Sequence, residues 1–323
     1  MNKIFEEFSK IGIIPVIAIE DAFDAQPLAK ALIDGGLPCA EVTFRTEAAE
    51  AAIRSMTEHF PDMLVGAGTV LTTEQVDTAV NAGAEFIVSP GFNAKVVKYC
   101  LEKEIPVIPG CSGPSDIEAA IELGLEVVKI FPAEASGGIG AIRAMAAPYH
   151  KMKFMPTGGI HSGNIKSYLD FKKIIACGGS FMVKDELQKK KDWEGIAALT
   201  REAVSAMLGF TIHHIGINCE SEAEAAASGE QFAKLFGAKL NVKEKSVFAG
   251  PYVELMKHPG RGANGHIAIG VNYVERAVYQ MEQRGFRFEE TSKIYEKDGS
   301  LKFIYFADEI AGFAVHFVKN DME

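Results

Sequence analysis

Short β-branched runs alternate with Ala-rich amphipathic segments between residues 12 and about 180 of this sequence. β-Branched residues favour strands, whereas Ala and an apolar period of 3.6 residues favour helices. Helices are predicted over 22–34, 73–82 and 114–123, and strands over 13–19, 40–44, 64–70, 85–89, 106–109, 127–131, 153–156 and 174–176. About eight strand–helix units in a run of this length predict an α/β fold, a compact parallel (β/α)8 TIM barrel, with a last helix over 192–208. A doubly wound open sheet is the alternative, but no Gly-rich dinucleotide fingerprint follows the first strand.

A different pattern begins at Gly209. His-Ile-Gly-Ile at residues 214–217 recurs about 50 residues later as His-Ile-Ala-Ile at 266–269. Each copy leads into a helix-like stretch and ends in a strand of similar shape, at 252–256 and 314–318. We therefore expect a barrel domain over residues 1–208 and an internally duplicated α+β domain over 209–323.

The composition narrows the partners and the compartment. The 323 residues are 48% hydrophobic and 24% charged, which is enough for two cores, and the net charge of −10 argues against nucleic acid as a partner. Five cysteines are odd in number and have no paired spacing, which suits a reducing cytoplasm. The N-terminus does not have the shape of a signal peptide, and no apolar stretch has the length of a bilayer. We expect a cytoplasmic protein without a membrane partner.

Lys129 is a lone cation in the apolar run Val-Val-Lys-Ile-Phe-Pro at residues 127–132. Strand alternation would put Val127, Lys129 and Phe131 on one face. Burial penalises an ammonium and favours the neutral amine, which is a nucleophile that forms imines with carbonyl substrates. The alternative is a lysine at a strand end whose charged head reaches the solvent.

Other polar residues lie at the ends of predicted strands, where the chemistry of these barrels is located. Period two puts Glu41, Thr43 and Arg45 on one strand face, so an acid, an arginine and Lys129 would converge. A structural ion pair between Glu41 and Arg45 is the alternative. The glycine pairs at 158–159 and 178–179 could be simple tight turns, but their position after strands seven and eight suits an anion held by backbone N–H groups.

Residues from about 10 to 205 resemble 2-keto-3-deoxy-6-phosphogluconate (KDPG) aldolase, a family that also covers 4-hydroxy-2-oxoglutarate (KHG) aldolase activity. The motifs that carry the resemblance are Glu-Val-Thr-Phe-Arg-Thr at 41–46, Val-Gly-Ala-Gly-Thr-Val-Leu at 65–71, Ser-Pro-Gly at 89–91, Lys-Ile-Phe-Pro-Ala-Glu-Ala at 129–135 and Pro-Thr-Gly-Gly-Ile at 156–160. One departure is Cys-Ser-Gly-Pro at 111–114, where a different small polar turn is expected.

The resemblance implies a class I lyase of the Entner–Doudoroff branch of carbohydrate metabolism, a homotrimer that needs no cofactor for the aldolase reaction. It would cleave KDPG to pyruvate and glyceraldehyde 3-phosphate, or KHG to pyruvate and glyoxylate, and the sequence leaves open whether the substrate ends in phosphate or carboxylate. A metal-dependent aldolase is disfavoured, because the barrel strands carry no cluster of histidines. The implied catalytic residues are Lys129 as the Schiff-base lysine and Glu41 as the general acid/base. The implied substrate-binding residues are Arg45, Thr69 and Pro90 around the pyruvate portion, Phe131 and Thr157 lining the site, and Gly158, Gly159, Gly179 and Ser180 facing the distal anion.

The duplicated region places four potential metal ligands at matching ends of its repeats: His214, Glu254, His266 and His316. Such N and O ligands suit a divalent cation such as Zn, Ni, Mn or Fe. Residues 211–319 resemble the glyoxalase/vicinal-oxygen-chelate family, whose paired βαβββ modules hold a metal in this manner. His316 stands where that family more often has a carboxylate, so glyoxalase I activity is not inferred, and His213 is expected on the opposite strand face. The alternatives are hydrogen-bonded core histidines and a non-catalytic binding or assembly module for the aldolase.

Overall fold

The computed structural model describes residues 2–320, and the chain forms two compact units, Met1–Met207 and Leu208–Glu323. Each unit has its own sheets and is described by itself. Within the described residues, no helix combines the length and the apolar character that crossing a membrane requires.

The first unit alternates strands and helices along the chain, as the sequence pattern predicts. Its strands are β1 (Ile13–Ile17), β2 (Cys39–Thr43), β3 (Leu64–Gly68), β4 (Ile87–Val88), β5 (Val107–Ile108), β6 (Gly110–Cys111), β7 (Val127–Ile130), β8 (Lys153–Pro156) and β9 (Cys177–Gly179). Its α-helices are α1 (Lys3–Ile11), α2 (Ala25–Asp34), α3 (Ala49–His59), α4 (Thr73–Asn81), α5 (Ala94–Glu102), α6 (Pro114–Glu122), α7 (Gly138–Ala146), α8 (Ile165–Leu169), α9 (Asp185–Lys189) and α10 (Trp193–Leu208).

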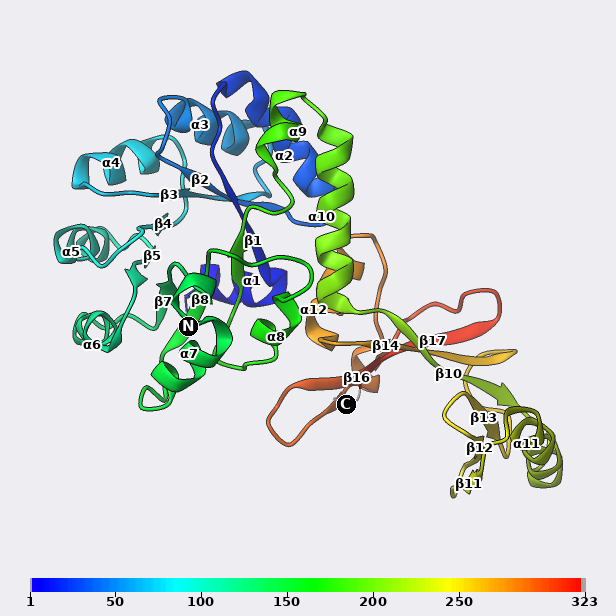
Figure 1. The fold of residues 1–323 in the computed structure, drawn as a ribbon. Coiled ribbons are helices and arrows are strands. Elements are labelled where there is room, and N and C mark those ends of the chain that lie inside the picture. Colours follow the sequence, from blue (N-terminus) through cyan, green and yellow to red (C-terminus); the bar gives the residue numbers. More distant parts are fainter. Residues whose placement is uncertain (1, 321–323) are drawn as a thin grey trace. The chain divides into compact units, whose positions relative to one another are not determined.

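All strand pairs of this unit are parallel among the described residues. One sheet has the order β5-β4-β3-β2-β1-β9, and a second has the order β6-β7-β8. Single parallel bridges from Phe154 to Ile174 and from Thr157 to Gly178 link the β8 side to the β9 side. The result is a curled parallel sheet, and Figure 1 shows α2 to α6 following one another around its outside.

Two predicted strands differ from the observed ones. The strand expected over 106–109 is interrupted at Pro109, which has no N–H to donate, so that β5 ends before it and β6 begins after it. The strand expected over 174–176 is wrong in position, because the ladder with β1 forms at Cys177–Gly179 instead.

The core of the first unit includes an aromatic contact between α1 and the start of β4. The rings of Phe8 and Phe86 have centroids 4.9 Å apart and planes at 89°, and both side chains are fully buried. A Cβ atom at Gly66 on β3 would overlap the Phe86 ring, so the glycine provides the space that this ring fills. Helix α1 is therefore attached to the parallel strands through buried aromatic area.

The second unit contains one mixed sheet with the order β11-β12-β13-β10-β14-β17-β16-β15. The first repeat consists of β10 (Thr211–Asn218), α11 (Glu222–Phe236), β11 (Leu240–Val242), β12 (Ser246–Ala249) and β13 (Val253–Met256). The second consists of β14 (Gly265–Val271), α12 (Val274–Glu282), β15 (Ile294–Tyr295), β16 (Leu301–Tyr305) and β17 (Phe313–Lys319). In each repeat the first and last strands pair in parallel, and the two repeats join through the antiparallel pair β10–β14. Each repeat thus runs β-α-β-β-β. The sequence duplication predicts two copies of an α+β repeat, and the order of the strands is the one that the resemblance implies.

We predict that Phe86→Ala lowers the free energy of unfolding by about 3–5 kcal/mol, because truncation leaves a cavity beside Phe8 and Gly66. Urea unfolding followed by circular dichroism measures the change. The control is Phe23→Ala, whose ring is 89% exposed and whose removal should change stability by less than about 0.5 kcal/mol. Equal effects of the two variants would contradict the packing role of Phe86.

Candidate active site and candidate metal site

Lys129 and Glu41 form a buried ion pair between β7 and β2. The Nζ atom of Lys129 lies 3.0 Å from Oε1 of Glu41, and the two side chains are 6% and 1% exposed. A Cβ atom at Gly68, at the end of β3, would overlap the Glu41 carboxylate, so this glycine leaves the space in which the carboxylate lies. The alternative of a lysine that reaches the solvent does not apply, because both charged groups are enclosed.

Of the residues predicted to share the face of Lys129 and Glu41, some lie near the pair and one does not. The Lys129 Nζ atom lies 5.5 Å from the centroid of the Phe131 ring, consistent with the predicted shared face. The Thr43 hydroxyl is also buried and donates to the Ile17 carbonyl at 2.8 Å. Arg45 is exposed and follows the end of β2 at Thr43, so strand alternation does not extend to it. The alternative ion pair between Glu41 and Arg45 is wrong, since within the described chain Glu41 pairs with Lys129.

The predicted pyruvate-side residues follow the ends of neighbouring strands. Thr69 comes directly after β3 and has φ of 56°, a left-handed conformation that is uncommon outside glycine. Pro90 is half-buried, two residues after β4. A left-handed conformation such as that of Thr69 is found often at functional sites, where the surrounding structure maintains it.

The end of β8 carries a buried hydroxyl and is followed by a turn of two glycines. The Oγ1 atom of Thr157 is buried and has no hydrogen-bond partner among the residues that the structure describes. Gly158 and Gly159 have φ of 98° and 80°, which only glycine adopts readily. Gly179 is buried at the end of β9, and Ser180 after it is exposed. An orphan buried hydroxyl calls for a partner, and a bound substrate can supply one.

Three residues of this region lie in quoted motifs or glycine pairs, but the sequence did not indicate the roles that the structure gives them. Gly68 and Gly178 give the Glu41 carboxylate and the Thr157 hydroxyl their space. Glu134 lies within the motif at 129–135 and accepts a hydrogen bond from Tyr168. The motif was the available signal for Glu134, whereas the effect of each glycine depends on the neighbouring strand.

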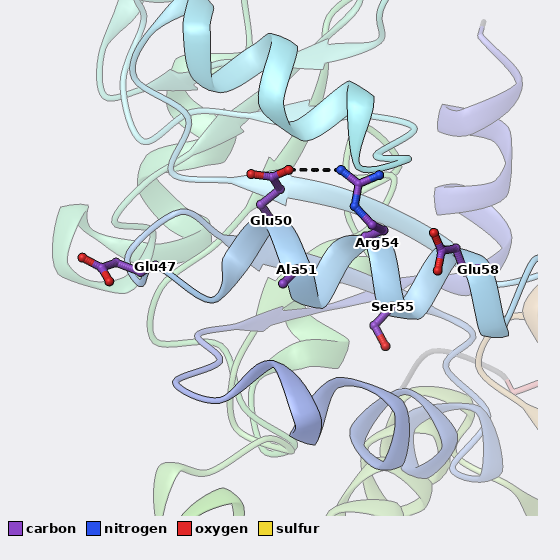
Figure 2. Close-up of a pocket in the computed structure, with 6 residues that line it drawn as sticks. All are labelled: Glu47, Glu50, Ala51, Arg54, Ser55 and Glu58. Atoms are coloured by element: carbon purple, nitrogen blue, oxygen red, sulfur yellow. Dashed lines mark hydrogen bonds and ion pairs between the residues drawn. The ribbon is translucent and has the colours of Figure 1, made fainter.

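A separate hollow lies on the outer face of α3, away from the residues of the buried pair. It is lined by Glu47, Glu50, Ala51, Arg54, Ser55 and Glu58, none of which is a predicted site residue. Figure 2 shows Glu50 and Arg54 pointing toward each other, at the 3.0 Å of an exposed i,i+4 pair. Such pairs add little stability and no chemistry, so we assign this hollow no role in the reaction.

The second unit brings three histidines together on one face of its sheet. His214 on β10, His266 on β14 and His316 on β17 are buried, and one ligand nitrogen of each lies within 4.8 Å of the others. Nε2 of His214 and Nε2 of His266 lie 3.1 Å apart. Ala268 on β14 pairs with His214 on one side and with His316 on the other, so these three side chains lie on one face of the sheet. His266 is two residues before Ala268 on the same strand, so alternation puts it on that face as well.

Glu254 on β13 completes the predicted set of four. Its Oε2 atom lies 3.2 Å from Nε2 of His214 and 3.1 Å from Nε2 of His266. The Ser246 hydroxyl donates to its Oε1 atom at 2.6 Å. Burial alone would raise the pKa of the Glu254 carboxyl, but hydrogen bonds from His214, His266 and Ser246 outweigh it and hold that pKa well below its usual range.

His213 does not face away from the cluster as predicted. A register shift between Ile212 and His214 marks an irregularity in β10, and it interrupts the alternation on which the prediction depended. Nδ1 of His213 lies 2.8 Å from Nδ1 of His214. His213 thus contacts a member of the cluster from outside, and it is not one of the three grouped histidines.

His316 differs from the other two histidines. Its Nδ1 atom is buried without a hydrogen-bond partner within the described part of the chain. Burial, together with the nearby His266 and His214, lowers the pKa of its imidazole to about 3. Three imidazoles, one of them with a buried nitrogen that has no partner among the described residues, lie beside the Glu254 carboxylate. This combination of N and O ligands fits a divalent cation.

We predict that acidification destabilises the metal-free protein through His316. Its unfolded form binds a proton below about pH 6.5, whereas the folded form binds one near pH 3, so stability is present above about pH 6.5 and is lost as the pH falls toward 3. The loss is at most about 1.4 kcal/mol per pH unit. Urea unfolding of chelator-treated protein at pH 6.5 and 5 measures it, and His316→Asn should show a shallower dependence. Equal slopes in both proteins would refute this origin.

Comparison with known proteins identifies the first unit. The family model for KDPG and KHG aldolases matches residues 4–199. A 2-dehydro-3-deoxy-phosphogluconate aldolase from Haemophilus influenzae is 48% identical over 203 residues, which cover 63% of this chain and 96% of that protein.

Two solved structures agree with this match. The KDPG aldolase from Legionella pneumophila, with pyruvate captured as a covalent carbinolamine intermediate, is 39% identical with a TM-score of 0.61, and the match covers 62% of this chain and 98% of that one. The 2-keto-3-deoxy-6-phosphogluconate aldolase from Zymomonas mobilis, solved with 3-phosphoglycerate, is 40% identical with a TM-score of 0.59, over 62% of this chain and 94% of that one. The family match ends before the second unit begins. Through residues 4–199, the chain belongs to the KDPG and KHG aldolase family, whose members are lyases.

Proposed function

We propose that the first unit is a class I aldolase that cleaves KDPG, KHG or both through a Schiff base on Lys129. The observation that carries the proposal is the enclosed 3.0 Å contact between Lys129 and Glu41. It places a nucleophilic amine beside a group that can take up and return its proton. The pyruvate carbinolamine of the Legionella pneumophila enzyme supports the same chemistry here.

The reaction follows from these two side chains. Lys129 transfers a proton to Glu41, and its neutral amine attacks the 2-keto carbon to give a carbinolamine. Glu41 returns the proton to the carbinolamine hydroxyl, which leaves as water, so that a protonated imine forms and the Glu41 carboxylate is regenerated. Glu41 then acts as the base that removes the C4 hydroxyl proton, the C3–C4 bond breaks, and the electron pair passes into an enamine of pyruvate. Protonation of the enamine carbon and hydrolysis of the imine release pyruvate and regenerate the lysine.

The remaining predicted residues bind the two ends of the substrate in this proposal. Arg45 offers a bidentate fork to the substrate carboxylate, while Thr69 and Pro90 surround the pyruvate portion. Phe131 and the Thr157 hydroxyl, which has no partner among the described residues, would line the site between the two ends.

The distal anion would be held by backbone N–H groups of Gly158, Gly159 and Gly179 and by the Ser180 hydroxyl, a set we call the anion cradle. Positive φ at Gly158 and Gly159 makes this turn possible. The similar Zymomonas mobilis aldolase was solved with 3-phosphoglycerate, a phosphorylated compound, and we favour KDPG as the substrate for that reason.

We further propose that the curled sheet is a (β/α)8 barrel, with an aldolase domain over 1–208 and a second domain over 209–323. The bridges from Phe154 to Ile174 and from Thr157 to Gly178 support closure of the sheet between β8 and β9. The division into two compact units at Leu208 supports the boundary. The homotrimer remains a prediction from the resemblance, and the cytoplasmic location remains a prediction from the cysteine pattern and the N-terminal sequence.

We predict that Lys129→Ala abolishes aldol cleavage while the fold is retained. Borohydride reduction in the presence of pyruvate should fix one adduct on the wild-type protein and none on this variant, because reduction traps only the imine of the active lysine. Mass spectrometry measures the adduct, and a lactate dehydrogenase-coupled assay measures pyruvate release. Lys98→Ala, an exposed lysine on α5, is the control that should keep both. Near-normal turnover by Lys129→Ala would refute the proposal.

A second proposed function concerns the cluster of His214, Glu254, His266 and His316. We infer that these residues hold a divalent metal such as Zn, Ni, Mn or Fe, and the grouping of three ligand nitrogens within 4.8 Å supports the inference. A bound metal would act as a Lewis acid toward the oxygens of an α-oxo or α-hydroxy compound. Ser246 would fix the orientation of the Glu254 carboxylate, as outer hydrogen-bond partners do for metal ligands. The β-α-β-β-β repeats support the glyoxalase/vicinal-oxygen-chelate resemblance, and a binding or assembly module is the alternative.

We predict about one divalent metal per chain in full-length protein prepared without chelator or affinity metal, because three imidazoles and a carboxylate are a ligand set that divalent metals bind. Elemental analysis measures the content. His316→Ala should lose the metal, and His258→Ala, an exposed histidine of the same unit, should retain it. No metal after addition of Zn, Ni and Mn would instead support the binding or assembly role.

A further inference from the structure

A buried hydrogen bond lies behind the turn that forms the anion cradle. Tyr168 on α8 is fully buried, and its hydroxyl donates to Oε1 of Glu134. Neither residue has a part in the reaction described above. Burial, followed by the hydrogen bond to Glu134, raises the pKa of the Tyr168 phenol, so that this hydroxyl keeps its proton and remains a donor.

Glu134 is in direct contact with the turn. Its backbone N–H donates to the Gly158 carbonyl at 3.1 Å. A Cβ atom placed on Gly159 would lie 2.5 Å from the Glu134 Cβ and 2.7 Å from its Cγ, so the stem of the side chain lies against Gly159. On the other side of the turn, the Asn164 amide donates to the Gly159 carbonyl at 3.0 Å. The turn is therefore fixed between Glu134 and Asn164.

The carboxylate of Glu134 is turned toward the start of α7. A Cβ atom at Gly138, the first residue of that helix, would lie 3.3 Å from Oε1 of Glu134 and 3.4 Å from the Tyr168 hydroxyl. Both the phenol and the positive end of the helix dipole favour a negative charge in this position. A negative side chain with its stem on Gly159 is thus held to one side by a specific donor.

The position of this charge matters because the cradle is proposed to take an anion. If Glu134 lost its donor, its carboxylate could turn toward the N–H groups of the Gly158–Gly159 turn, and it would compete there with the substrate. The competition would affect a phosphate, with its larger charge, more than a carboxylate.

We propose that Tyr168 and Glu134 are positioning residues that keep the anion cradle free and favour the phosphorylated over the carboxylate-ended substrate. The inference rests on the proposed function of the first unit. Tyr168 acts through Glu134, and neither residue touches the reacting atoms.

The test is steady-state cleavage of KDPG and KHG by the full-length Tyr168→Phe variant. We expect the KM for KDPG to rise roughly tenfold or more, as the loss of a hydrogen bond to a charged group implies. The kcat for KDPG and both constants for KHG should change less than about threefold. Borohydride trapping of pyruvate should be unchanged, because pyruvate has no distal anion for the cradle to bind.

Two variants separate this role from a structural one. Tyr149→Phe removes a comparable Tyr–Glu hydrogen bond, to Glu118 at an exposed position, and should leave all constants unchanged. Glu134→Gln keeps an acceptor for Tyr168 but removes the charge, so the KM for KDPG should stay equal or fall. This variant also tests the proposal should Tyr168→Phe fail to fold.

The outcomes distinguish the two proposals. An active wild-type protein with an unchanged KDPG KM in Tyr168→Phe overturns the positioning role alone. An equal loss with both substrates, or a rise in the KDPG KM in Glu134→Gln, also overturns it. A wild-type protein that cleaves neither KDPG nor KHG refutes the proposed aldolase function, and the positioning role falls with it.

Discussion

The enclosed contact between Lys129 and Glu41 is the constraint that the first unit is built to satisfy. Moving a carboxylate and an ammonium out of water costs several kcal/mol per ion, and the cost is recovered only when the two groups meet in good geometry. Here Lys129 comes from β7 and Glu41 from β2, and their side chains are 6% and 1% exposed. Little water is therefore present to compensate for misalignment of the two groups. The parallel register of the strands between them therefore has to be maintained by packing elsewhere, such as the Phe8–Phe86 contact.

Space is the second requirement, and missing side chains supply it. Gly68 accommodates the Glu41 carboxylate, and Gly178 accommodates the Thr157 hydroxyl. Gly68 ends β3 and Gly178 lies within β9, and at each position a Cβ atom would occupy the place of a functional group. The site thus requires positions without a side chain, at Gly68 and Gly178, as well as the charged groups. Close approach of another group to the backbone is a recognised reason for glycine in a strand.

The sequence predicted the features that depend on alternation within one strand. It did not predict where a strand ends or becomes irregular, or which distant residues come into contact. Burial of Lys129 beside Phe131 follows from alternation within one strand, and the structure confirms it. Arg45 was misplaced because β2 ends two residues earlier, and His213 because β10 is irregular there. The bond between Tyr168 and Glu134 joins residues 34 apart, and no periodic pattern announces such a contact.

The second unit shows how duplication can bring four polar side chains together and then make them chemically different. Pairing the first strands of both repeats places His214 beside His266, and the last strands contribute Glu254 and His316 at corresponding positions. The copies are chemically unequal, because Glu254 accepts from two imidazoles and Ser246, whereas Nδ1 of His316 has no partner within the described residues. Three imidazoles this close repel one another when protonated, which contributes to the lowered pKa of His316. Two of these imidazoles donate their Nε2 protons to Glu254, and a cation that took the place of those protons would stabilise an arrangement that is otherwise costly to bury.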